Sequence, residues 1–220
     1  ATVTISYTGD PDSPIETLTT DESGQTPEIN LKAPPRELSL TPDITEQPYS
    51  EYNIQVTAEG FETVLVSGSE ILAGAYSLQP IRMNPLDVTE EEEKVVVIPP
   101  HTLFGEYPPK IPEEEIKPMN ETGEIVLSRV VIPEYVIVHD GDPEDPTARN
   151  YWVRYKDYIK NVASSEIYPT WPESAIYANI LVIQSFTLNR VFTEWYRGKG
   201  YDFTITSSTA YDQKWIYGRN

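Results

Sequence analysis

The sequence predicts an α+β protein: an N-terminal β-sandwich, an acidic proline-rich linker, and a mixed α+β domain around a buried central helix. Three observations carry this prediction. Residues 1–86 contain short alternating strands, residues 87–125 are rich in proline and glutamate, and residues 154–198 have a helical period. The 220 residues suffice for two ordinary domains. We therefore place boundaries at 1–86, 87–125 and 126–220.

The first segment reads as β structure throughout. "ATVTISY" alternates apolar and polar residues, and "YNIQVTAEGFETVLVSG" holds two such runs joined by Glu59-Gly60, a hairpin-type turn. Closely spaced short strands are typical of a small sandwich. Residues 1–86 contain no histidine, and their acidic residues fall mostly in turns. We interpret this segment as a binding or spacer module.

The second segment reads as a connector. Prolines recur from Pro85 to Pro118, which favours an extended, polyproline-like chain. The apolar run "VVVIPPHTLFG" suggests that this chain lies along a surface. Glu90–Glu93 is better interpreted as solvated charge than as a metal site, because adjacent carboxylates repel each other and nothing else converges on them.

The third segment combines strands with two helices. "IVLSRVVIPEYVIVHD" gives two β-branched runs, and one helix is predicted over about 154–167. A second helix is predicted from a cap at Thr170, with Pro172 in its first turn, to Gly198. Its apolar residues cover most of its circumference, so we expect it to be buried.

The loop between these strands and the first helix is acidic. Its carboxylates do not have the spacing of an EF-hand, so a plain acidic loop is favoured over a calcium site. His139, just before it, is expected to be structural rather than catalytic. The carboxylates in question are Asp140, Asp142, Glu144 and Asp145.

Composition excludes several functions. The net charge of −19 argues against nucleic acid and anionic membrane surfaces as partners, whereas a neutral sugar polymer is compatible. The absence of cysteine excludes disulfides and thiolate metal sites. No run approaches the roughly 20 apolar residues of a membrane span. The first residues already resemble a strand, so we expect the natural amino terminus to lie upstream.

Glu166 interrupts an apolar stripe. Tyr155, Ile159 and Val162 share one helical face, and Glu166 continues it at the carboxyl end of the predicted helix. The helix dipole and burial both raise the pKa of a carboxyl group there, and a carboxyl group that is protonated near neutrality can act as a general acid.

Two other interpretations of Glu166 stay open on periodicity alone. It could turn to solvent at a fraying helix end, or pair with Lys160 or Arg154. The aromatic residues that follow it, Tyr168, Trp171 and Tyr177, offer flat surfaces suited to sugar rings.

The segment "YIKNVASSEIYPTWPESAIYANILVIQSFTL" resembles the core motif of the stage II sporulation protein D family. The motif has a Ser-Glu pair, a short aromatic or proline-bearing stretch, then Trp-Pro-x-x-Ala and a helix. The later "YDFTITSSTAYDQKWIYG" is similar to the family's next segment. The β module, through "YNIQVTAEGFETV", resembles carboxypeptidase regulatory or transthyretin-like domains, and the whole arrangement is similar to spore cortex-lytic enzymes. The matching core residues are Ser165, Glu166, Trp171, Pro172, Ala175, Ile176 and Ala178.

The resemblance implies a peptidoglycan lytic transglycosylase of the spore cortex or cell wall. Glu166 would be the single general acid and base that yields 1,6-anhydromuramoyl products, with Trp171, Tyr168, Tyr177 and Ser165 contacting the glycan. The implied partner is the peptidoglycan glycan strand, and the implied location is outside the cytoplasm, in the spore or cell envelope. No cofactor is implied. Some family members carry a metal-associated cysteine pair, and this chain has none, so we expect no zinc.

The resemblance also implies more than this chain holds. The family domain continues past the position that matches Asn220, so we expect a further carboxyl-terminal part, without which the catalytic groove is incomplete. The alternative function is non-catalytic: a structural or glycan-binding module of the envelope, or a pro-segment released by a protease.

Overall fold

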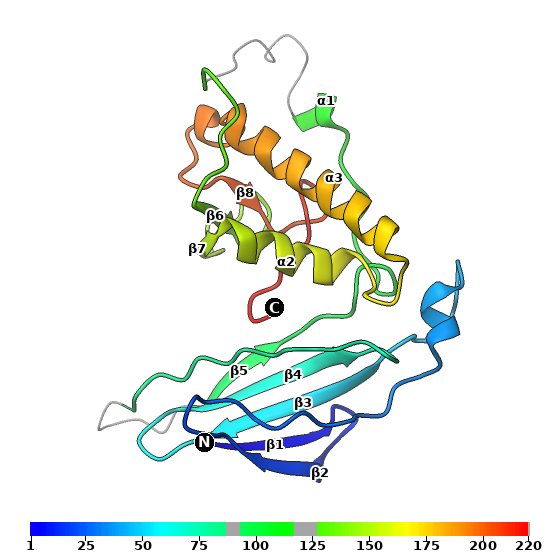
Figure 1. The fold of residues 1–220 in the computed structure, drawn as a ribbon. Helices are drawn as coiled ribbons and strands as arrows, with labels where there is room; N and C mark the ends of the chain where they lie inside the picture. The colour runs from blue at the N-terminus through cyan, green and yellow to red at the C-terminus, as the bar shows by residue number, and fades with distance from the viewer. Residues whose placement is uncertain (87–92, 117–126, 220) are drawn as a thin grey trace. The chain divides into compact units, whose positions relative to one another are not determined.

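The computed structural model describes residues 1–86, 93–116 and 127–219. It is a mixed α+β structure, as predicted, with two sheets and two long helices (Figure 1). The chain forms two compact units. Unit 1 comprises Ala1–Pro100, Pro169–Trp171 and Tyr217–Asn220, and unit 2 comprises His101–Tyr168 and Pro172–Ile216. These bounds differ from the predicted ones, because two short late segments belong to the amino-terminal unit.

Unit 1 contains a five-stranded sheet. Neighbouring strands are antiparallel except for the parallel pair β4 and β5, and the order is β2-β1-β3-β4-β5. The predicted turn at Glu59-Gly60 joins β3 to β4, and Gly60 has a φ of 78°, which glycine adopts without strain. A short 3₁₀ helix, η1, spans Arg36–Leu40. The strands are β1 (Thr2–Tyr7), β2 (Asp10–Thr19), β3 (Ser50–Thr57), β4 (Thr63–Ile71) and β5 (Glu93–Val97).

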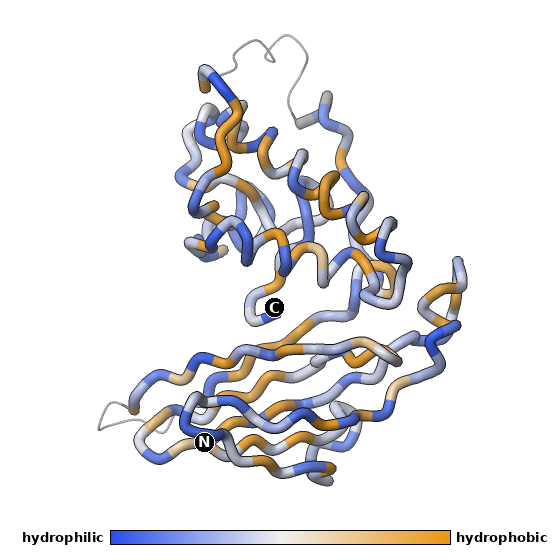
Figure 2. The backbone as a smooth tube through the Cα atoms, viewed as in Figure 1, coloured by the Kyte–Doolittle hydropathy of each residue, from blue (hydrophilic) through white to orange (hydrophobic). Residues whose placement is uncertain are grey.

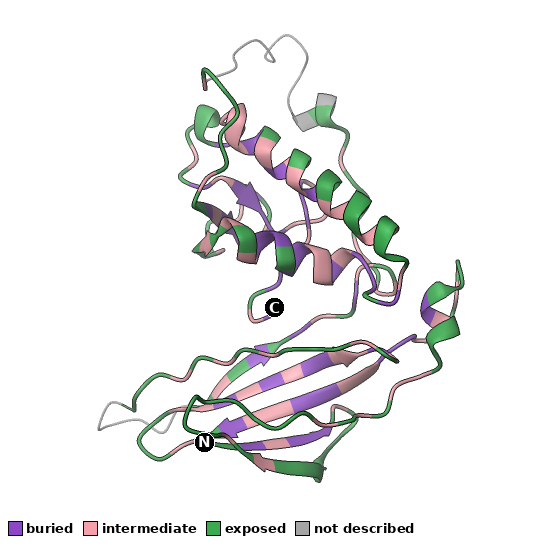
Figure 3. Ribbon diagram, viewed as in Figure 1, coloured by how far each residue is buried: buried purple, intermediate pink, exposed green. Residues whose placement is uncertain are grey.

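The alternation seen in the sequence becomes one buried face of this sheet. Val3, Ile5, Tyr52 and Val56 form a core cluster, and buried and partly exposed residues alternate along most of β4 (Figure 3). Apolar side chains from extended, non-strand segments pack on the cluster, among them Ile29, Leu31, Ile81 and Met83. Figure 2 shows the same alternation as hydropathy along the strands. A second sheet, which a sandwich requires, is not formed by the described residues of this unit, so the sandwich remains a prediction.

The predicted connector is wrong for residues 93–97. They form β5, paired in parallel with β4, because three consecutive valines suit a pleated, half-buried surface. Beyond it, residues 101–112 lie along unit 2, where Ile111 N–H donates to the Ala210 carbonyl. A short helix, α1 (Glu113–Ile116), follows. Glu93 accepts a hydrogen bond from Gln55, and the rest of the Glu90–Glu93 cluster lies outside the described residues.

Unit 2 places a helix on a three-stranded sheet of order β7-β6-β8. The strands are β6 (Tyr135–His139), β7 (Asn150–Arg154) and β8 (Ile205–Thr206). Helix α2 (Tyr155–Glu166) follows β7 directly and matches the helix predicted over about 154–167. Val136 and Val138 are fully buried, as are Tyr158 and Val162 of α2. A 3₁₀ helix, η3 (Arg197–Lys199), precedes β8.

Helix α3 (Glu173–Phe192) departs from its prediction in three ways. Pro172 occupies the cap position, while the Thr170 hydroxyl instead shares a 2.7 Å hydrogen bond with Ser39. The helix ends before Gly198. It is also not buried all round, because Leu181 and Val182 are exposed and inward-facing residues such as Ile183 and Thr187 are buried. Apolar residues around a helix show that it could be buried, but the described part of unit 2 covers only one side. None of the described helices is long and apolar enough to cross a membrane.

Candidate functional site

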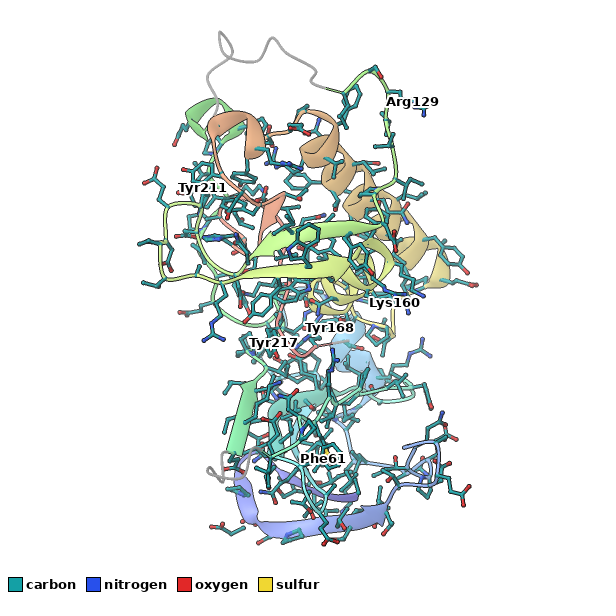
Figure 4. All side chains as sticks on the ribbon, turned by 90° about the vertical axis from the view of Figure 1, so that its left-hand side faces the viewer. Phe61, Arg129, Lys160, Tyr168, Tyr211 and Tyr217 are labelled. Carbon is teal, nitrogen blue, oxygen red and sulfur yellow. The ribbon has the colours of Figure 1, made fainter. Side chains whose placement is uncertain are left out.

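Glu166 is the last residue of α2 and lies in a half-buried position. The helix continues its buried stripe through Ile159 and Val162, and the carboxyl group comes one turn later on that side. Neither alternative interpretation applies. Lys160, labelled in Figure 4, is exposed and pairs with Asp157 at 3.9 Å, and Arg154 lies over the Tyr135 ring.

One oxygen of Glu166 is fixed by backbone. Its Oε1 accepts a 2.8 Å hydrogen bond from the Lys214 N–H, and Oε2 accepts none from the described residues. Burial raises the pKa of the Glu166 carboxyl above its usual value, while the Lys214 N–H and the charge of Lys110 oppose that rise. The outcome is a carboxyl group in a fixed position, with one free oxygen and a raised pKa.

Lys110 supplies the nearby positive charge. Its ammonium donates 3.0 Å hydrogen bonds to the carbonyls of Tyr211 and Asp212, so it is tied to the irregular segment that also carries Lys214. Burial lowers the pKa of Lys110, and the charges of Asp212, Glu113 and Glu166 oppose that effect. The sequence interpretation placed Lys110 in a connector and missed it. A lone lysine between prolines gives no local signal for such a role.

A buried ion pair anchors the same segment. Arg190 Nε donates to Asp212 Oδ1 at 2.7 Å, and both side chains are fully buried. Asp212 Oδ2 accepts three more hydrogen bonds, from the Tyr196 hydroxyl and from the backbone and hydroxyl of Thr206. Both oxygens of this buried carboxylate are therefore engaged, which favours a structural role for Asp212 over that of a base or nucleophile.

Two further side chains hold the backbone around Glu166. Asn161 of α2 makes a reciprocal pair with Ile216, donating to its carbonyl and accepting from its N–H at 2.8 Å each. Gln213 Oε1 accepts from the Thr187 hydroxyl at 2.8 Å and from the Tyr158 hydroxyl at 3.3 Å. The segment 211–216 is thus held from α2 and α3 on either side of Lys214.

Two of the predicted glycan contacts are buried. Ser165 is 0% exposed, its hydroxyl donates to the Asn161 carbonyl, and its own carbonyl accepts from Thr102. Tyr168 is buried and packs on His101 with ring centroids 4.4 Å apart. Neither side chain presents surface to a polymer, so both act in this structure as packing residues that set the end of α2.

The other two predicted contacts lie in different units. Trp171 is half-buried in unit 1, where its indole N–H donates to the Ser39 carbonyl at 3.1 Å. Tyr177 belongs to α3 of unit 2 and is 58% exposed, with its hydroxyl donating to Glu173. Trp171 and Glu166 therefore belong to different units, and Tyr177 is accessible.

The acidic loop after β6 is held by hydrogen bonds within the chain. Asp145 accepts hydrogen bonds from the backbone and hydroxyl of Thr147, and Asp140 accepts from Ser207. His139 is buried, stacks on Phe203, and shares a 2.7 Å hydrogen bond with Asn150, as a structural histidine does. In the described part of the chain, no group of three or more His, Asp or Glu residues is placed to hold a metal ion.

The geometry around Glu166 suits proton transfer. The carboxyl group is half-buried, one of its oxygens is free, and the charge of Lys110 limits the rise of its pKa. Comparison with known proteins adds no assignment to this geometry. No family model, no curated protein and no solved structure matches the chain.

Proposed function

We propose that the chain is a peptidoglycan lytic transglycosylase, or the part of one that carries its acid, of the stage II sporulation protein D kind. The observation that carries this proposal is the environment of Glu166. Burial raises the pKa of its carboxyl group while a single backbone N–H fixes one oxygen. A general acid needs a proton at working pH and a fixed direction, and the raised pKa and the fixed oxygen both favour that role.

The pairing of Asp212 supports a mechanism that uses one acid. A hydrolase of glycosidic bonds ordinarily uses two carboxyl groups, one as acid and one as nucleophile or base. Asp212, on the segment that binds Glu166, has its acceptor capacity filled by Arg190, Tyr196 and Thr206. Of these two carboxyl groups, Glu166 is therefore the one that has an oxygen free to react.

The proposed reaction returns Glu166 to its starting state. Its Oε2–H protonates the glycosidic oxygen as the C1–O bond breaks. The 6-hydroxyl of the same muramic acid then attacks C1, and its proton passes to Glu166. A 1,6-anhydro ring forms and no water is consumed. Lys110 would limit how far the pKa of the acid rises, so that Glu166 can also act as the base in the second half.

The decisive experiment compares Glu166→Gln with the wild type on purified cortex and vegetative peptidoglycan. The variant is nearly isosteric and keeps the acceptor for the Lys214 N–H. Product release with the anhydro mass, one water lighter than the hydrolysis product, should be lost in the variant and retained in Glu173→Gln, which removes an exposed carboxylate of α3. Equal release by Glu166→Gln and the wild type would eliminate this assignment.

A non-catalytic role in the envelope is the second candidate. It is favoured by the burial of Ser165 and Tyr168, which leaves fewer glycan contacts at Glu166 than the resemblance implies. The sandwich of carboxypeptidase regulatory type belongs to this proposal as a spacer or binding module. This alternative predicts retention on peptidoglycan with no anhydro product from the wild type.

A further inference from the structure

The connection from α2 to α3 is short and stiff. It spans residues 167–172, and Glu166 is the last residue of α2 before it. Pro169 and Pro172 each fix the backbone torsion φ, so few conformations are open to the connection. A stiff connection passes on any displacement of its middle part. Whatever holds that middle part therefore also restrains the end of α2 that carries Glu166.

The middle of this connection is held by η1, the short 3₁₀ helix of unit 1. Contacts place Pro169–Trp171 in unit 1, although the helices on either side of it along the chain belong to unit 2. Arg36 Nη2 donates to the Thr170 carbonyl at 2.8 Å, and the hydroxyls of Ser39 and Thr170 share a bond of 2.7 Å. The Trp171 indole N–H donates to the Ser39 carbonyl at 3.1 Å. Three hydrogen bonds thus fix two consecutive residues of the connection.

The bond between the two hydroxyls is buried and has a direction. Ser39 is 5% exposed and Thr170 is 4% exposed, so water does not readily replace either partner. The Ser39 hydroxyl donates its proton to the Arg36 carbonyl at 2.7 Å. A hydroxyl group has one proton to donate, so Thr170 is the donor to Ser39. This chain of two bonds ties Thr170 to the first turn of η1.

These bonds give Trp171 and the amino-terminal unit a different use from the one that the sequence suggests. The indole N–H of Trp171 is committed to the Ser39 carbonyl, so it attaches the connection to η1. A spacer has no need of such bonds to the residues that follow Glu166. Arg36 and Ser39 supply the three bonds from one short helix, which makes η1 a specific anchor for the connection.

We propose that Arg36 and Ser39 are positioning residues for Glu166. By fixing the middle of the α2–α3 connection, they hold the end of α2, so that the carboxyl group of Glu166 keeps its half-buried place. The amino-terminal unit then takes part in the proposed reaction through Glu166 and is more than a spacer. The role in the reaction rests on the proposed function, whereas the positioning of Glu166 is a property of the fold and is measured without turnover.

A carbon-13 NMR titration of the Glu166 carboxyl group in the full chain tests the positioning. Burial is the main cause that raises the pKa of this group, so a looser end of α2, which admits water, lowers the titration midpoint. Ser39→Ala should lower it by about 0.5 pH unit. The matched control is Thr41→Ala, which removes the hydroxyl bond to the Glu37 carbonyl at the other end of η1 and should leave the midpoint unchanged. Equal midpoints in Ser39→Ala and the wild type would overturn the role of Ser39.

Two further variants keep the test valid if Ser39→Ala folds poorly. Arg36 is exposed, so Arg36→Met should fold, and loss of its bond to the Thr170 carbonyl should lower the midpoint in the same direction. An unchanged midpoint would overturn the role of Arg36. Thr170→Val removes the hydroxyl bond from the other side. If that bond is what acts, Ser39→Ala, Thr170→Val and the double variant should have the same midpoint, and additive shifts would contradict it.

Failure of this inference is separable from failure of the proposed function. On peptidoglycan, Ser39→Ala should lower kcat and leave KM unchanged, because it displaces the acid without touching a substrate contact. An unchanged kcat would overturn the part of the amino-terminal unit in the reaction. If Glu166→Gln still released anhydro product, the catalytic assignment would fail, while the titration midpoints of Ser39→Ala and Thr41→Ala would still decide whether η1 positions Glu166.

Discussion

Asp212→Asn should destabilise the chain strongly, because it leaves a buried arginine without its main partner. Arg190 and Asp212 are both fully buried, and their bond is 2.7 Å long. Asparagine keeps one oxygen. If that oxygen replaces Oδ2, its NH₂ meets the Arg190 N–H. If it replaces Oδ1, its NH₂ faces donors from Tyr196 and Thr206. Breaking one partner of such a pair costs about 3–5 kcal/mol, or roughly 10 °C in the unfolding midpoint.

Chemical unfolding followed by tryptophan fluorescence measures this loss well. The Trp195 ring lies 4.1 Å from the Arg190 guanidinium carbon and so reports on the ion pair directly. Asp202→Asn is the control: Asp202 is exposed and accepts one hydrogen bond from Asn150, so its loss should cost less than about 0.5 kcal/mol. A cost below about 1 kcal/mol for Asp212→Asn would refute the view that this pair fixes the segment that holds Glu166.

Four further outcomes are expected. Burial raises the pKa of Glu166 in the folded chain, so its ionisation disfavours folding as pH rises; Glu166→Gln should resist urea better than the wild type at about pH 7 and lose that advantage near about pH 4. Lys110→Met removes a charge that lowers the pKa of Glu166, so a carbon-13 NMR titration of that carboxyl should shift to higher pH. Gly68→Ala should cost about 2–4 kcal/mol in chemical unfolding, since its Cβ would lie 2.5 Å from a backbone oxygen at a φ of +87°, whereas Gly9→Ala meets nothing and should cost far less. Glu194→Gly should raise the free energy of unfolding by about 1 kcal/mol by relieving left-handed strain.

The sequence identified Glu166 because a charged residue in an apolar stripe is a local signal. The same signal was present at Arg190, which lies on the inward face of α3 and is buried, as Thr187 is. It could have been found by the same test. Lys110 could not, because its partners are backbone carbonyls about one hundred residues later in the chain. No local pattern encodes a contact of that kind.

The two fold predictions that failed share one cause. Helix α3 looked buried because its apolar residues surround it, and residues 93–97 looked like a connector because prolines follow them. Burial of α3 depends on which parts of unit 2 pack against it, and strand formation at residues 93–97 depends on the free edge of β4. That is a property of the assembled unit, so helix period and proline content could not supply it.

By itself, the sequence determined that residues 1–86 form strands, where the two long helices begin, and that one carboxyl group would end a buried stripe, since alternation, helical period and turn residues act within a few positions of the chain. The tertiary structure alone decided which residues surround that carboxyl group. It brought Lys110 and the Lys214 N–H to Glu166 and placed Trp171 in the other unit. The physical reason is that pKa shifts and ion pairs depend on distance in space, which separation along the chain does not fix.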